Sequence, residues 1–108
     1  MLLHDVGEII AIREFSLTDG AKVTLTIRKP QAYPDGRDFY CPFQISGIGK
    51  DTVWHTGGVD GLQALIIALK TAATFLYTSQ EFQTGQLSWI AGSNPGDIGF
   101  PAMEPEAG

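Results

Sequence analysis

The clearest hydrophobic pattern of the chain runs from Asp60 to Tyr77, where apolar residues recur at the three- and four-residue spacing of one helix face. The stripe, roughly 120° wide, consists of Leu62, Leu65, Ile66, Leu69, Ala72, Ala73 and Leu76. Asp60 stands at the N-cap position, and Gln63 three residues later completes a capping-box pattern. The pattern predicts a helix that ends between Tyr77 and Phe82 and lays this stripe against a sheet.

Before the helix, apolar and polar residues alternate with the period of two that is typical of strands. Four strands are predicted there, over residues 8–17, 22–29, 38–46 and 52–56, and a short fifth strand follows the helix over residues 86–90. The alternation of the first segment is imperfect near Arg13. This irregularity indicates either a bulge near that residue or a sheet whose two faces are both partly covered.

The turn between the first two strands is Thr18-Asp19-Gly20, and the parity of the flanking residues narrows its type. Residues that face each other across a ladder must lie on the same face of the sheet. A two-residue Asp-Gly loop mixes the faces, whereas a three-residue loop pairs Leu17 with Ala21 and Phe15 with Val23. The longer loop also places Gly20 at its left-handed position, and we therefore predict it.

Two further segments shape the predicted architecture. Residues 30–36 hold two prolines and an Asp-Gly pair, which predicts a surface loop. Pro42 cannot donate to a ladder, so the third strand is predicted to be an edge strand or to be bulged there. The sequence thus predicts an α+β fold: a four- to five-stranded, mainly antiparallel sheet with one long helix packed on one face, in the order β-β-β-β-α-β. We expect a single domain over residues 1–101 and a frayed tail over residues 102–108.

Composition excludes several classes of protein. The chain of 108 residues has a net charge of −5 and no basic stripe, which argues against nucleic-acid binding. Its longest apolar run, from Ala64 to Leu69, is too short to span a membrane, and its beginning lacks the pattern of a signal peptide. These features and the single Cys41 predict a cytoplasmic protein without a disulfide.

Three blocks of sequence carry a resemblance: Tyr40–Ile45, Gly58–Leu65 and Gly96–Pro101. With them, the chain over residues 8–101 resembles a family of small, mostly bacterial proteins that is catalogued only as a domain of unknown function. The resemblance implies an α+β fold. It implies no established activity, so no catalytic residue is carried over to this sequence.

The chemically reactive residues do not form a recognisable motif. Cys41 alternates with Phe39 and Phe43 on an apolar face, where a thiol behaves as a small inert hydrophobe. The four possible metal ligands, His4, Asp5, His55 and Asp60, lack the spacing of a metal site. Gly57 and Gly58 are better explained by a sharp turn into the helix than by an anion site. We therefore predict no catalytic residue, no metal and no cofactor.

Several large apolar residues fall outside the predicted core, and their convergence would mark an association surface. This possible interaction surface consists of Ile10, Ile12, Tyr40, Trp54 and Ile67. It favours a non-enzymatic interaction protein that binds a second copy of itself or an unknown protein partner. The alternative is a small-molecule binding protein or an enzyme with its site near Tyr40, His55 and the start of the helix.

Overall fold

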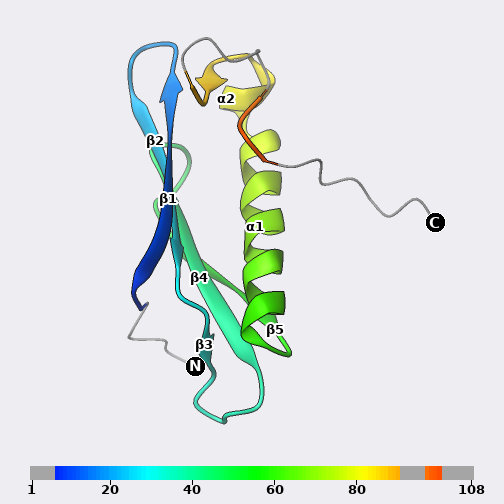
Figure 1. The fold of residues 1–108 in the computed structure, drawn as a ribbon. Coiled ribbons are helices and arrows are strands. Elements are labelled where there is room, and N and C mark those ends of the chain that lie inside the picture. Colours follow the sequence, from blue (N-terminus) through cyan, green and yellow to red (C-terminus); the bar gives the residue numbers. More distant parts are fainter. Residues whose placement is uncertain (1–6, 91–96, 101–108) are drawn as a thin grey trace, which may run out of the picture.

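The computed structural model describes residues 7–90 and 97–100, and it has the predicted α+β fold (Figure 1). The elements are β1 (Ile9–Leu17), β2 (Lys22–Arg28), β3 (Gln31–Ala32), β4 (Phe39–Ser46), β5 (Val53–Gly58), α1 (Gly61–Tyr77), α2 (Gln80–Gln83) and β6 (Leu87–Ser88). A mainly antiparallel sheet with one long helix on one face is therefore confirmed. The short elements β3 and α2 were not predicted.

The strands form one sheet in the order β3-β4-β2-β1-β6, and β5 pairs with β4 as well. Because β2 and β5 both pair with Phe43 and Gln44, they lie on opposite sides of β4. The prediction that the strand of Pro42 is either an edge strand or bulged there is thus wrong, because β4 has neighbours on both sides and its ladder with β5 runs through Pro42 without a register shift. The ladder from β2 stops at Phe43, and the ladder from β3 begins at Tyr40. Pro42 lies in the gap between these two ladders, where its lack of an N–H group costs the sheet no hydrogen bond.

The hairpin between β1 and β2 is the predicted one. The Leu17 amide donates to the Ala21 carbonyl at 2.8 Å, and Gly20 has a φ of +91°. Phe15 pairs with Val23 as expected. A bulge does interrupt β1, but the register shift lies between Ile9 and Ala11 rather than near Arg13.

The helix α1 begins and ends where the sequence predicted. The Asp60 carboxylate accepts a hydrogen bond from the Gln63 amide at 2.7 Å, which is the predicted N-cap. The Gln63 side chain in turn accepts from the Val59 amide at 2.7 Å. This second bond reaches one residue further back than in the usual capping box, and it ties the end of β5 to the helix.

The face that α1 buries overlaps the predicted stripe at Ala72, Ala73 and Leu76 but is rotated away from Leu62 and Ile66. The buried residues of the helix are Ala64, Ala68, Ala72, Ala73 and Leu76. Leu65 and Leu69 pack at the margin of the core, while Leu62 is 66% exposed and Ile66 is 43% exposed. A β-carbon added at Gly58 would lie 2.5 Å from the Ala64 nitrogen, so the helix backbone runs very close to β5. At this end of the helix only small side chains fit between helix and sheet.

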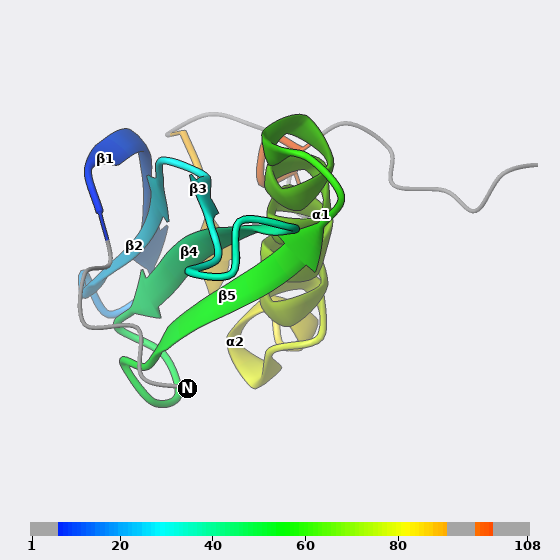
Figure 2. The same ribbon diagram turned by 90° about the horizontal axis from the view of Figure 1, so that it is seen from below.

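This close approach sets α1 to one side of the sheet. The helix packs on β4 and β5, and β1 and β2 lie farther from it in the view from below (Figure 2). Residues 97–100 cover part of the remaining inner face, and Ile98 from this segment is fully buried in the core. The predicted tail over residues 102–108 lies outside the described residues.

Neither α1 nor α2 is long and apolar enough to cross a membrane, and no other helix occurs in the described part of the chain.

The rotated helix face can be tested with one pair of substitutions. Leu76 is fully buried, so Leu76→Ala should lower the free energy of unfolding by about 2–5 kcal/mol through the cavity it leaves. Leu62→Ala, the same change on the exposed side of the helix, should alter it by less than about 0.5 kcal/mol. Urea denaturation of both variants measures the difference. A large loss for Leu62→Ala would restore the stripe predicted from the sequence.

Candidate functional site

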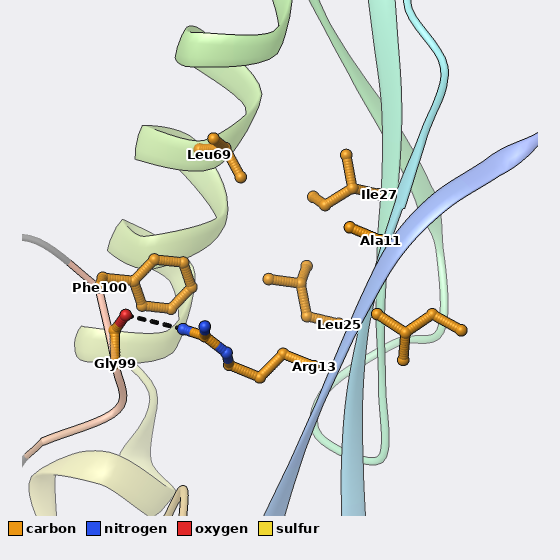
Figure 3. Close-up of a pocket in the computed structure, with 8 residues that line it drawn as sticks. Ala11, Arg13, Leu25, Ile27, Leu69, Gly99 and Phe100 are labelled. Carbon is orange, nitrogen blue, oxygen red and sulfur yellow. Dashed lines mark hydrogen bonds between the residues drawn. The ribbon is translucent and has the colours of Figure 1, made fainter.

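An apolar cleft of about 270 Å³ opens between the sheet and α1, on the side that the helix leaves uncovered (Figure 3). Its lining comes from β1, β2, α1 and the segment 97–100, and consists of Ala11, Ile12, Arg13, Leu25, Ile27, Leu69, Gly99 and Phe100. Leu25 and Ile27 form the base on the sheet, Leu69 faces them from the helix, and Phe100 closes one side (Figure 3). The cleft is thus a direct consequence of the off-centre helix.

Arg13 is the one charged residue of this lining. It belongs to the inner face of β1, because it pairs with the buried Leu25 of β2. Its side chain reaches across from the sheet to the segment 97–100, where Nη1 donates to the Gly99 carbonyl at 2.8 Å and lies 3.4 Å from the Ile98 carbonyl (Figure 3). This contact holds the segment 97–100 to β1.

Two aromatic rings hold the same guanidinium. Its carbon lies 4.2 Å from the centre of the Trp89 ring and 5.5 Å from that of Phe100. Both distances are within the range of a cation–π interaction. Arg13 therefore joins β1 to two segments that follow the helix, and its charge stays at the edge of an apolar cleft.

This role of Arg13 was not predicted from the sequence, in which the residue marks only the place of an irregular strand. One sign of it was present. Arg13 has the same parity as Phe15 and Leu17, so a regular β1 directs a lone cation toward the core side of the sheet. What the sequence could not supply was the position of Trp89 and of residues 97–100 opposite that side chain.

The second predicted region, near Tyr40, His55 and the start of the helix, does come together in part. The ring centres of Tyr40 and His55 are 5.9 Å apart, and Tyr33 lies 4.9 Å from Tyr40 and 6.4 Å from His55. The three rings share the outer face of the sheet. Tyr40, however, is only 5% exposed, so this cluster presents mainly Tyr33 and His55 to solvent.

The five residues of the predicted interaction surface do not form one surface. Tyr40 is buried, because Tyr33 and His55 pack against its ring. Trp54 lies on the helix side of β5, with its ring centre 5.4 Å from that of Phe75, and not on the outer face. Ile10 and Ile12 are exposed on β1, on the far side of β2 and β4 from Trp54. Ile67 is exposed on α1.

Trp54 belongs to a second hollow, of about 450 Å³. It lies between the β4–β5 turn and the end of α1, and its apolar residues are Ile45, Ile48, Trp54 and Phe75. Lys50 and Glu81 stand among the polar residues of its lining, so it carries charges of both signs.

Cys41 is fully buried, and its thiol donates to the Arg28 carbonyl at 3.3 Å. Loss of solvent around the buried thiol raises its pKa to about 11. Because the thiolate is the reactive form, this cysteine is poorly suited to nucleophilic catalysis.

The residues that were weighed as metal ligands have other positions. Asp60 caps α1, and His55 packs against the two tyrosine rings. His4 and Asp5 lie outside the described residues. Within residues 7–90 and 97–100, no three His, Cys, Asp or Glu side chains gather into a metal-binding group.

Burial of Cys41 predicts a low rate of thiol modification. In the folded protein near pH 8, labelling by a disulfide reagent should be at least about tenfold slower than in 6 M guanidinium chloride, because the folded thiol is both covered and protonated. Raising the pH toward 11 should increase the labelling rate of the folded protein, since its thiolate forms only near that pH. Equal rates for folded and unfolded protein at pH 8 would contradict the buried position.

Comparison with known proteins identifies a family and nothing further. No curated protein matches the chain, and no solved structure matches it. The model of the family described as "Domain of unknown function (DUF6968)" matches residues 11–102, a range that takes in most of β1, the helix and the cleft. The chain therefore belongs to this family of unknown function.

Proposed function

We propose that this protein is a non-enzymatic interaction protein that pairs with another protein strand along the free edge of β1, and that a second copy of the chain can supply that strand. The observation that carries the proposal is an apolar strand edge without a partner. Among the described residues, β6 pairs with β1 only at Ser16 and Leu17, so nothing pairs with that side of β1 from Ile9 to Phe15.

The backbone of this edge has N–H and C=O groups that point away from β2. Leu17 and Ala21 form a hydrogen-bonded pair, and in an antiparallel ladder such pairs alternate along the strand. The backbone N–H and C=O groups of Arg13 and Phe15 therefore point toward β2. The N–H and C=O groups of Ile12 and Glu14 point the other way, toward the open edge. An added strand would satisfy them.

The side chains of the same edge favour association. Ile9 is 46% exposed, Ile10 45% and Ile12 58%. Exposed apolar side chains on an unpaired edge are the combination that natural monomers usually avoid. The bulge near Ile10 limits regular pairing to the part of β1 that follows it.

A second copy suits this edge because antiparallel pairing about a two-fold axis is self-complementary. With the axis at Ile12, the two Ile12 side chains face each other, and each Ala11 faces the Arg13 of the other copy. Ala11 leaves room for that arginine, whose side chain is held by Gly99 and Trp89. Two chains of net charge −5 repel each other, so association should be weak at low salt and stronger at high salt.

A cytoplasmic location is part of the same proposal, and the unpaired, buried Cys41 supports it. The bacterial origin implied by the sequence resemblance stays a prediction.

The alternative of a small-molecule site at Tyr40 and His55 has one supporting observation, the proximity of the two rings. We rank it second, since burial of Tyr40 leaves a small accessible surface there.

Sedimentation velocity over a range of concentrations tests the self-association. The unmodified chain should shift from monomer to dimer below about 100 μM, the range of micromolar interfaces. Ile12→Lys should remain monomeric, because a lysine on an edge strand opposes pairing. Ile67→Lys is the matched control: Ile67 is an exposed isoleucine on α1, far from the edge, and its variant should still dimerise.

A monomer at every concentration up to about 100 μM would refute self-association. Loss of the dimer in Ile67→Lys but not in Ile12→Lys would move the interface to the helix.

A further inference from the structure

We propose that the cleft around Arg13 is a binding site for a small apolar monocarboxylate, with the guanidinium holding the carboxylate and the cleft holding the hydrocarbon part. This goes beyond association through the β1 edge, since it assigns a ligand to a site between the sheet and the helix.

The shape and lining of the cleft indicate the apolar part of the ligand. Leu25, Ile27, Leu69 and Phe100 provide its hydrocarbon surfaces. Its volume of about 270 Å³ is close to the lower end of the roughly 300–1,000 Å³ that small-molecule sites occupy. A short aliphatic chain or a single aromatic ring suits this space.

The charge of the ligand follows from the donors that Arg13 leaves free. Nη1 is taken by the Gly99 and Ile98 carbonyls. Nε and Nη2 make no hydrogen bond in the described structure, and no carboxylate pairs with the guanidinium there. These two groups form a fork that matches the two oxygens of a carboxylate.

The position of the guanidinium reduces the entropic cost of binding. Trp89 and Gly99 already fix its place, so little side-chain freedom remains to be lost when a ligand binds. A single carboxylate is favoured over a phosphate, because Arg13 is the one cation of the lining and the chain as a whole is acidic.

Octanoate is a suitable probe, and methyl NMR spectra of the full chain report on the cleft directly. Titration with octanoate should shift the methyl signals of Leu25, Ile27 and Leu69. The methyl signals of Val59, an exposed residue that does not line the cleft, should not move. Octanol, which has the same chain without the charge, should bind at least tenfold more weakly.

Two variants locate the site. Arg13→Gln should weaken octanoate binding at least tenfold, and Arg37→Gln, a change in an exposed loop, should leave it unchanged. Because Arg13→Gln also removes the bond to Gly99, Leu69→Trp provides a second test. It fills the cleft and should abolish binding while the arginine is retained.

Four results would overturn the proposal. The first is the absence of methyl shifts with octanoate. The second is equal binding of octanol and octanoate. The third is binding that Arg13→Gln and Leu69→Trp leave unchanged. The fourth is a set of cleft shifts that follow protein concentration and not octanoate, which would mean that a second copy of the chain occupies the cleft.

Discussion

The close contact between α1 and β5 is the constraint on which the rest of this structure depends. Gly58 leaves no room for a side chain beneath Ala64, and the Thr56 hydroxyl donates to the Ala64 carbonyl at 3.0 Å. The strand is thereby tied to the first turns of the helix. Alanines occupy the helix–sheet contact from this end of the helix, at positions 64, 68 and 72, and the larger Leu76 is buried at the other end. A helix held this near to β5 lies over β4 and β5, and cannot also cover β1 and β2.

The candidate binding surfaces of the chain lie on and beside the half of the inner face that the helix leaves uncovered. Residues 97–100 cover part of it, and Arg13 holds them there through Gly99 and the ring of Trp89. What remains open is the apolar cleft and, beside it, the edge of β1. Both proposals thus have one structural origin. The cleft exists because the helix is off-centre, and among the described residues the edge is open because β6 reaches only the last two residues of β1.

The sequence predicted the local features well, because each depends on a few neighbouring residues. The β1–β2 hairpin follows from the parity of Phe15 and Val23, and the start of the helix from the Asp60 cap. The helix face was predicted only in part: Ala72, Ala73 and Leu76 are buried as expected, but Leu62 and Ile66 are exposed, because a periodic pattern weighs hydrophobicity and not size. Leu62 and Ile66 count strongly in such a pattern, but the space beside Gly58 admits only alanine.

Features that require distant segments could not be predicted in the same way. Pro42 indicated an edge strand or a bulge, yet it lies in a central strand at a gap between two ladders. The role of Arg13 depends on Gly99, 86 positions later in the chain. The predicted interaction surface failed to converge for a related reason: the strand order places Ile12 and Trp54 at opposite sides of the sheet.

In the proposed self-association, the edge of β1 is open in the monomer and closed when two copies pair. Amide hydrogen exchange measures this residue by residue. In dilute protein, the amides of Ile12 and Glu14 should exchange quickly, while those of Arg13 and Phe15, bonded to β2, should be protected. In concentrated protein, exchange at Ile12 and Glu14 should slow markedly and that at the outward amides of β5 should not. Equal exchange rates for Ile12 and Glu14 at both concentrations would contradict the account.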